Sequence, residues 1–508
     1  MRLSGCSLAL AAAAVLCAAA ARGEPADGDW NGVISTPAAD LHIVVHIKSG
    51  PGGALKATLD SPDQGAGGIP IGDVTATAAT LAFTVPAVAG AYQATWDPAT
   101  HRWVGTWTQG GHPLPFELAR GLPLRPASTC ADKTPSPWPK WCDILIWTPA
   151  EQQSAYANMD KVFPVHIVRR GPPRRELPVS ERPLKLSFKV GDETWTTADF
   201  LRRTHASGVL VLQGGAIRME AYQDNNQPPF DRRWPGFSVT KSVTSTLVGA
   251  AIRDGAIAGL DAPVTDYLPE LKGSAYDGVT VRQLVTMTSG VRWNENYGDP
   301  KADIANYDRT PGPPDEDAVL AYMAKLPRDT APGTRFHYST GDATLAGKVV
   351  ARATHKSLAD YLSEKIWAPA GMERDAAWVL GHSDGQEAGG WGLAMTLRDE
   401  GRLGLFMLDG GMIAGKPVLP DGWVSDATTN HNPGSPPGPG YGYYWWLRPG
   451  GYSAVGVFGQ TMYINPARRL VVVVQSAWPF ASDAEDGTAQ TAFLTAIYAA
   501  ATQPQPAK

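Results

Sequence analysis

The sequence predicts an α+β fold, with an antiparallel sheet flanked by helices, preceded by a small all-β domain. Three observations support this. Residues 29–120 form short alternating runs of apolar and polar residues, broken by Gly, Pro and Asp. Hairpin patterns lie near both ends of residues 147–508, with helical patterns between them. Pro-rich stretches separate the two regions. Hairpins at both ends of a domain favour an antiparallel sheet over repeated βαβ units.

The composition is that of a globular protein. The 508 residues allow two to four domains and a core large enough to enclose a buried site. With 44 Lys and Arg against 49 Asp and Glu, the formal net charge is −5. This charge produces no field that would concentrate nucleic acid or an anionic membrane, so nucleic-acid binding is not expected.

Residues 1–23 are predicted to be a secretory signal peptide. One Arg precedes an uncharged run of Ala, Leu and Val, which small residues follow. The apolar run at residues 7–21 is too short for a membrane span of about 20 residues. We therefore expect a periplasmic or secreted protein with no transmembrane segment in its mature form. A lipid anchor is the less favoured alternative. Residues 3–6 resemble a lipoprotein cleavage box, but no hydrophobic region precedes them, and before Cys17 the bulky Leu16 stands where a small residue is needed.

Residues 24–125 are predicted to form a β-sandwich or small barrel as an accessory domain. Leu41, Ile43, Val45 and Ile47 are spaced two apart, which is the period of a strand with one buried face. Further alternating runs contain tryptophans. We assign no chemistry to this domain.

Residues 126–146 are predicted to be a Pro-rich linker with a disulfide. Cys6 and Cys17 leave with the signal peptide, so Cys130 and Cys142 are the remaining pair in an oxidising compartment. Closing this loop should stabilise the fold by roughly 3 kcal/mol.

Residues 147–508 are predicted to form the main domain. Glycines and an Asn-Pro turn mark the hairpin connections, and an Ala-rich C-terminal stretch predicts a helix that packs back on the sheet. The predicted elements are a hairpin of residues 209–212 and 217–222, a hairpin of residues 462–464 and 470–475, and a helix at residues 484–500.

A buried helix is predicted directly after Ser238. Val239, Val243 and Leu247 form an apolar stripe at helical spacing, and Asp254 with the glycine after it is a typical C-terminal signal. Ser238 then lies in the first turn of the helix.

Ser238 and Lys241 are the candidate nucleophile and base. Residues three apart in a helix lie on one face, so the amine can approach the hydroxyl. A serine hydroxyl reacts poorly until a neighbouring base takes its proton. The lysine pKa of about 10.4 must fall to near 7 for this role, a change that costs about 4 kcal/mol. Burial and the positive end of the helix dipole both favour the neutral amine.

Three further stretches occur in a fixed order after SVTK: LVTMTSGVRWNENY, GTRFHYSTGDATLAG and AVGVFGQTMYINPARRLVVVVQS. With these motifs, residues 147–500 resemble the superfamily of serine β-lactamases and penicillin-binding proteins. Within it, they most resemble class C-like esterases and amidases of the 6-aminohexanoate-dimer hydrolase type. The resemblance covers about two thirds of the chain and implies a β-lactamase/transpeptidase-like fold with a helical subdomain.

The resemblance implies roles for individual residues. Ser238 matches the acylated nucleophile, Lys241 its proton partner, and Tyr338 the tyrosine that passes a proton to the leaving group. Gly459 and Gln460 match the inner strand that lines the site, where the Gln460 N–H would be the second oxyanion donor beside the Ser238 N–H. On the residues alone, Gly459 fits a bend in a strand equally well.

Several aromatic residues keep two interpretations open. Tyr297 matches a substrate-contacting tyrosine of the amidase-type relatives, or it is a core aromatic residue. For Trp391, Trp445 and Trp446 we favour the core over the pocket.

Two departures from the family pattern bear on the substrate. Thr340 occupies the place of Asn in the Tyr-x-Asn box, and Lys-Thr-Gly does not occur in the chain. The resemblance therefore favours hydrolysis of an ester or an unusual amide of small-molecule size through an acyl-enzyme. β-Lactamase or D-Ala peptidase activity is one alternative, and a non-catalytic binding protein that keeps the pocket is another. Neither a metal nor an organic cofactor is implied.

Gly381–Gly385 spell Gly-x-Ser-x-Gly, the nucleophile elbow of α/β-hydrolases. An elbow requires a helix directly after the serine, and QEAGGWG is a poor helix start. We predict a surface turn here.

Overall fold

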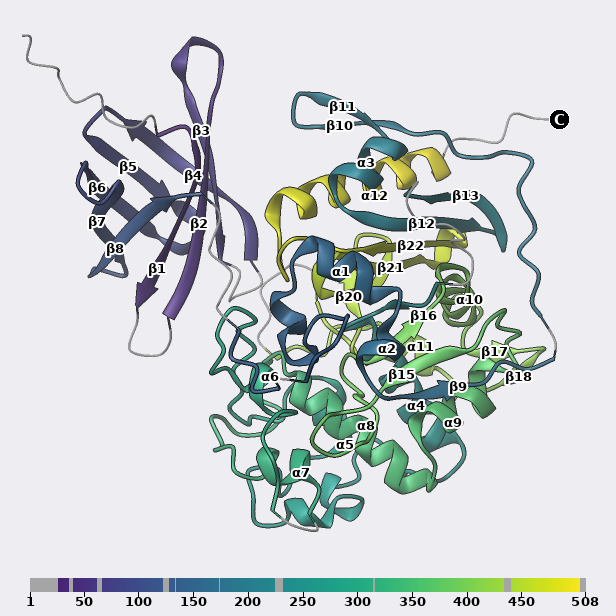
Figure 1. Cartoon of the computed structure of the whole chain (residues 1–508). Coiled ribbons are helices and arrows are strands. Elements are labelled where there is room, and N and C mark those ends of the chain that lie inside the picture. Colours follow the sequence, from purple (N-terminus) through teal and green to yellow (C-terminus); the bar gives the residue numbers. More distant parts are fainter. Residues whose placement is uncertain are drawn as a thin grey trace, which may run out of the picture. The chain divides into compact units, whose positions relative to one another are not determined.

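The computed structural model describes residues 26–35, 40–61, 66–121, 128–132, 134–172, 174–223, 232–313, 316–433 and 440–502 (Figure 1). The predicted signal peptide lies outside these residues. The chain divides into two compact units, the second of which includes everything from residue 124 onwards. Each unit is described by itself.

The N-terminal unit contains a closed antiparallel barrel whose eight strands follow sequence order. Closure comes from the pairing of the first strand with the last, at Trp30↔Arg120 and Asn31↔Ala119. The prediction of an all-β fold is confirmed, as a barrel and not a sandwich. The strands are β1 (Gly28–Ser35), β2 (Asp40–Ser49), β3 (Leu55–Ser61), β4 (Ala66–Ala76), β5 (Thr80–Val85), β6 (Gly90–Asp97), β7 (Arg102–Gln109) and β8 (His112–Arg120).

Large side chains fill the interior of the barrel. Ile43, Val45 and Ile47 of β2 point into it, as their spacing predicts. Trp30 and Trp103 are fully buried beside them, with their rings 6.0 Å apart in an edge-to-face arrangement. The barrel therefore has a packed core.

The second unit is built on a six-stranded antiparallel sheet in the order β13-β12-β22-β21-β20-β19. Both predicted hairpins are present. Gly214 and Gly215, with positive φ angles, connect the first, and the 3-10 turn Pro466–Arg468 connects the second. The strands are β12 (Ala206–Gln213), β13 (Ala216–Tyr222), β19 (Trp446–Arg448), β20 (Gly451–Gly456), β21 (Gln460–Asn465) and β22 (Leu470–Ser476).

Helices cover both faces of this sheet. Val209 and Val211 pack with Phe493 of α12 (Ala484–Thr502), the predicted C-terminal helix, and with α3 (Thr197–Arg203). Figure 1 shows α12 and α3 beside β12 and β13. Leu210 and Leu212 point to the opposite face, where α4 (Val239–Arg253) and α10 (Leu397–Leu408) lie. Alternate side chains of one strand thus enter two cores, which explains the unbroken apolar runs at residues 209–212 of β12 and 470–474 of β22. The predicted α+β fold is confirmed.

Short elements complete the second unit. A four-stranded sheet in the order β14-β16-β15-β9 lies among the helices. Its strands are β9 (Val165–Val168), β14 (Trp234–Pro235), β15 (Ala376–Val379) and β16 (Leu393–Met395). The remaining helices are α1 (Pro149–Tyr156), α2 (Met159–Val162), α5 (Val281–Val285), α6 (Asp303–Asn306), α7 (Ala318–Met323), α8 (Thr340–Thr354), α9 (Leu358–Leu362) and α11 (Trp423–Ala427). Two small hairpins are β10 (Ser187–Val190) with β11 (Glu193–Thr196), and β17 (Met412–Ile413) with β18 (Lys416–Pro417).

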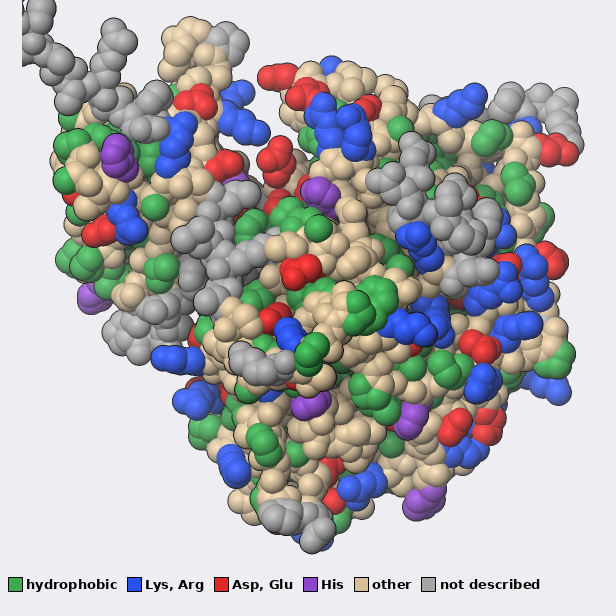
Figure 2. All heavy atoms as spheres, viewed as in Figure 1, with side chains coloured by type: hydrophobic (Ala, Val, Ile, Leu, Met, Phe, Trp, Pro, Cys, Tyr) green, Lys and Arg blue, Asp and Glu red, His purple; other side chains and the backbone are tan. Residues whose placement is uncertain are grey.

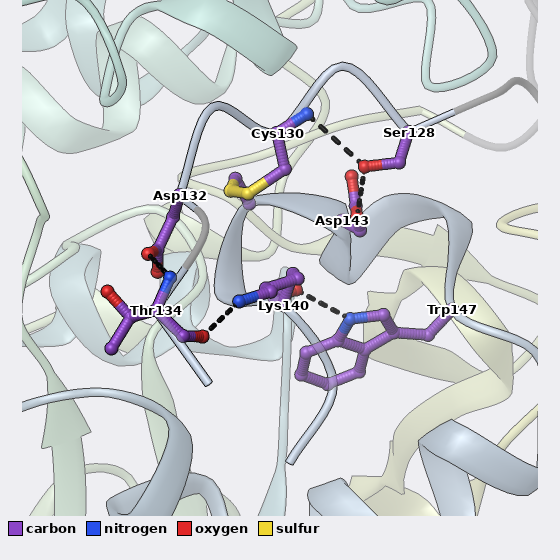
Figure 3. Close-up of a disulfide and its surroundings, with 8 residues drawn as sticks. Ser128, Cys130, Asp132, Thr134, Lys140, Asp143 and Trp147 are labelled. Atoms are coloured by element: carbon purple, nitrogen blue, oxygen red, sulfur yellow. Dashed lines mark hydrogen bonds between the residues drawn. A yellow bond between two sulfur atoms is a disulfide. The ribbon is translucent and has the colours of Figure 1, made fainter. Parts of the chain in front are cut away.

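Cys130 and Cys142 form the predicted disulfide, with their Cα atoms 5.6 Å apart (Figure 3). Basic and acidic side chains are interspersed on the face of the second unit that Figure 2 shows. In the part of the chain that the structure describes, no helix combines the length and apolar character that crossing a bilayer needs.

Candidate active site

Helix α4 positions Ser238 and Lys241. Ser238 is the N-cap residue and follows a tight turn in which Phe237 has a φ of 45°, in the left-handed region that non-glycine residues rarely adopt. The Lys241 Nζ donates a hydrogen bond of 2.8 Å to the Ser238 Oγ. Among the described residues, no acceptor is bonded to the backbone N–H of Ser238, so this donor is available to a ligand.

The Lys241 amine is enclosed by protein. Its side chain is buried, and its Nζ also donates to the Gly390 carbonyl oxygen at 2.9 Å. Burial lowers the pKa of Lys241 to about 8, while the Glu295 carboxylate acts in the opposite direction. Part of the lysine population is therefore neutral at physiological pH, as a base for Ser238 requires.

Tyr338 lies beside this pair. It precedes α8, whose N-cap residue Ser339 accepts a hydrogen bond from the Asp342 N–H. The Lys241 Nζ lies 5.1 Å from the centre of the Tyr338 ring. Burial and the Glu295 charge raise the pKa of Tyr338 above its usual value, and a hydrogen bond with Ser238 opposes this shift. Ser238, Lys241 and Tyr338 thus lie around one point.

Glu295 is a site residue that the sequence analysis did not identify. Its carboxylate accepts hydrogen bonds from the Thr340 backbone N–H at 2.9 Å and from the Tyr297 hydroxyl at 2.8 Å. The Thr340 hydroxyl and the Trp293 indole N–H also donate to it. Glu295 therefore connects the start of α8 with the loop that contains Tyr297. Its negative charge raises the pKa of both Lys241 and Tyr338.

Gly459 and Gln460 lie at the bend between β20 and β21. Gly459 has a φ of 89°, and a Cβ atom there would lie 2.4 Å from the Trp478 ring. The Gln460 side chain is buried. Its Nε2 donates to the Ser476 carbonyl oxygen at 2.6 Å, and its Oε1 accepts from the Ser476 N–H at 3.0 Å. Neither residue is among those that line the cavity at Ser238, whereas Val457 in the same bend is.

Ser238 lines an open apolar cavity of about 620 Å³, a volume that includes the solvent at its entrance. Most of its lining is aromatic or aliphatic. The lining residues are Trp141, Cys142, Ile144, Leu145, Phe163, Phe237, Ser238, Tyr297, Ile304, Ala305, Tyr307, Asp308, Arg309, Thr340, Trp391 and Val457.

Among the aromatic residues that the sequence placed in either the pocket or the core, some line the cavity and others do not. Tyr297 and Trp391 line the cavity, and the Trp391 indole N–H donates to the Tyr307 hydroxyl at 3.1 Å. Trp445 is buried in the core. Trp446 stacks on the Tyr338 ring with 6.0 Å between the ring centres.

The Gly381–Gly385 sequence forms a turn, as predicted, and no helix begins directly after Ser383. Its role is to hold Asp308. The Ser383 Oγ donates to the Asp308 carboxylate at 3.4 Å, and the backbone N–H groups of His382 and Ser383 donate to it as well. Burial and the nearby Asp384 raise the pKa of Asp308 to about 7. Asp308 is the carboxyl group in the cavity lining.

The residues missed by the sequence analysis carry weak local signals. Glu295 lies in the quoted WNENY stretch, and Thr340 is the departure from the Tyr-x-Asn box, but nothing in their spacing indicates that they bind each other. Across the described ranges, no group of three or more His, Cys, Asp or Glu residues is arranged to hold a metal ion.

The chain is similar to several known proteins. The family model described as Beta-lactamase matches residues 197–495. A 6-aminohexanoate-dimer hydrolase from Paenarthrobacter ureafaciens is 31% identical over 342 residues, which are 64% of this chain and 85% of the relative. Esterase EstB from Burkholderia gladioli is 36% identical over 156 residues, 28% of this chain and 37% of the esterase.

A solved structure supports the same fold. The structure, from Bacillus anthracis and assigned provisionally to the 6-aminohexanoate-dimer hydrolases, superposes with a TM-score of 0.60 at 22% identity. The match covers 70% of this chain and 96% of that structure. The predicted β-lactamase/transpeptidase-like fold is therefore confirmed. The matched residues contain Ser238, Lys241 and Tyr338, and the chain belongs to the Beta-lactamase family of hydrolases.

Proposed function

We propose that this hydrolase cleaves ester or amide bonds of small molecules through an acyl-enzyme on Ser238. The observation that carries the proposal is the 2.8 Å hydrogen bond between a buried Lys241 Nζ and the Ser238 Oγ. Because burial lowers the pKa of this lysine to about 8, it can accept a proton near neutral pH.

The proposed reaction has two halves. In the first, the Ser238 Oγ attacks the carbonyl carbon while its proton moves to the Lys241 and Tyr338 pair. That proton then leaves with the departing alcohol or amine, and the acyl group stays on Ser238. In the second half, water attacks the acyl carbon of the Ser238 ester. Its proton passes through the same pair to the Ser238 Oγ as the bond between that oxygen and the acyl carbon breaks, and the acid is released. We assign the base to the Lys241 and Tyr338 pair as a whole, since neighbouring groups in one proton path share their protons.

Two backbone N–H groups would stabilise the oxyanion. The Ser238 N–H is one, since it is unbonded within the described chain and lies at the start of α4. Gln460 is the second donor that the family resemblance implies. Val457 is a further candidate, because it lines the cavity with Ser238 and Gln460 does not.

Within this proposal we favour ester or unusual amide substrates over β-lactams and peptides. Apolar side chains dominate its lining, and Thr340, in the place of the family Asn, binds Glu295. The predicted signal peptide and the Cys130–Cys142 disulfide support a periplasmic or secreted location.

A substrate panel tests the proposal. Esters, short linear amides, β-lactams and D-amino-acid peptides are offered to the wild-type protein and to Ser238→Ala. We expect hydrolysis of short-chain aryl esters that Ser238→Ala reduces to the uncatalysed rate. Unchanged ester hydrolysis in Ser238→Ala would contradict the mechanism. Binding without turnover of any class would favour the non-catalytic alternative, and fast β-lactam turnover would favour the β-lactamase alternative.

A further inference from the structure

The disulfide segment (residues 128–132 and 134–146) lies before the part of the chain that matches the family model, which begins at residue 197. It nevertheless belongs to the same compact unit as Ser238. A disulfide and side-chain hydrogen bonds hold its conformation (Figure 3). These are Cys130–Cys142, Ser128 Oγ to Asp143 Oδ2 at 2.6 Å, Cys130 N to Ser128 Oγ at 3.2 Å, and Trp147 Nε1 to Lys140 O at 2.9 Å.

The end of the disulfide segment forms part of the cavity wall. The 3-10 helix Trp141–Ile146 contributes Trp141, Ile144 and Leu145 to the lining of the cavity that contains Ser238. Leu145 also lines an adjacent cavity of about 310 Å³. One short helix, outside the family match, therefore bounds the space that a substrate of Ser238 would occupy.

A second segment of the chain packs against the Trp141 ring. It stacks on the His382 ring with 3.8 Å between the ring centres and 23° between the planes. His382 belongs to the turn that binds the Asp308 carboxylate, and Asp308 also lines the cavity. Trp141 is thus a large, positioned apolar surface and not a loosely attached side chain.

We propose that the disulfide segment is the specificity element of this hydrolase, and that it selects substrates carrying an apolar group close to the scissile bond. The inference rests on the proposed role of Ser238. Trp141, Ile144 and Leu145 would receive the apolar group, while Ser238 attacks the adjacent carbonyl. Substrates with a small or charged group at this place would leave the apolar wall exposed to water.

Burial against this wall sets the size of the effect. Removing a methylene group from water is worth about 0.8 kcal/mol, which is about fourfold in kcat/KM. We expect kcat/KM to rise by up to about fourfold for each methylene that reaches the wall. Without the Trp141 ring, the gain should fall to about twofold or less per methylene.

Two series of esters test the inference, one with acyl chains from acetyl to hexanoyl on one alcohol, the other with alcohols of increasing length on acetate. Each series is measured with the wild type, Trp141→Ala and the control Trp138→Ala. Trp138 lies in the same segment but is not among the residues lining either cavity. Leu145→Ala is a milder second change of the wall, measured whether or not Trp141→Ala folds. Labelling with a fluorophosphonate reports on Ser238 in each variant.

In at least one series, we expect Trp141→Ala to reduce the gain in kcat/KM per methylene, and Leu145→Ala to reduce it less. Trp138→Ala should retain the wild-type gain. An unchanged gain in both wall variants would overturn the inference, as would an equal loss for all esters or the same reduction in Trp138→Ala. Absence of labelling at Ser238 in the wild type would overturn the proposed function itself. Labelling with unchanged gains would overturn only the role of the disulfide segment.

Discussion

The rate of ester hydrolysis should depend on the protonation of Lys241. Burial lowers the pH at which the rate changes, and the Glu295 charge should raise it. Only the neutral amine can take the proton of Ser238. With a pKa of about 8, the amine is neutral in half of the molecules at pH 8. The same pKa leaves about 9% neutral at pH 7 and about 90% at pH 9. We therefore expect kcat/KM to rise about tenfold between pH 7 and pH 9.

Glu295→Gln isolates the electrostatic part of this prediction. The Glu295 charge raises the pKa of Lys241, so its removal should move the inflection to lower pH and increase the relative rate at pH 7. The amide keeps one oxygen that can accept from the Thr340 N–H, which helps to preserve the loop. Glu176→Gln, a change of an exposed glutamate, is the matched control and should leave the inflection in place.

Initial rates are measured by pH-stat titration of an alkyl ester between pH 6 and 9.5 at constant ionic strength. This choice avoids a leaving group that titrates in the same range. A flat profile would refute proton transfer from Ser238 to a pair that contains Lys241. An inflection at the same pH in Glu295→Gln and the wild type would refute the role assigned to the Glu295 charge.

Three further changes have direct readouts. Tyr338→Phe should lower kcat by about 10²- to 10⁴-fold with a much smaller change in KM, and a kcat near the wild-type value would remove Tyr338 from the proton path. Gly459→Ala should lower the free energy of unfolding in urea by about 2 kcal/mol, because it places a Cβ 2.4 Å from a tryptophan ring at a positive φ; equal stability would contradict that contact. Arg402→Met removes the 2.8 Å partner of the buried Asp399 carboxylate, while Glu373 keeps Arg174 at 3.0 Å. It should reduce stability by about 3 kcal/mol in the same assay, and unchanged stability would contradict the importance of the Arg402–Asp399 pair.

Much of the fold is predictable from the sequence because its signals are local. The alternation in β2, the Gly214–Gly215 turn and the stripe on α4 each involve residues within one element or one hairpin. Closure of the barrel depends instead on pairing between β1 and β8, which are far apart in sequence. No period within either strand indicates that pairing, so the sequence left sandwich and barrel open.

In the candidate active site, too, contacts between residues close in sequence could be predicted, and contacts between distant residues could not. Ser238 and Lys241 are three residues apart on one helix, so their contact follows from helical geometry. Glu295 and Thr340 are 45 residues apart in sequence, and the fold of the chain between them brings them into contact. Trp141 lines the cavity although it lies before the residues that the family model matches. Such contacts depend on tertiary packing, which neither motif spacing nor hydrophobic periodicity describes.

The acyl-enzyme on Ser238 is tested most directly by acid-quenching the protein during turnover of an ester and mapping its tryptic peptides by mass spectrometry. Residues 234–241 follow Arg233 and end at Lys241, so they form one tryptic peptide in which Ser238 is the single serine. We predict that this peptide carries the mass of the acyl group. An acyl group on the peptide that contains Ser383, or turnover with no adduct on residues 234–241 at any quench time, would contradict the account.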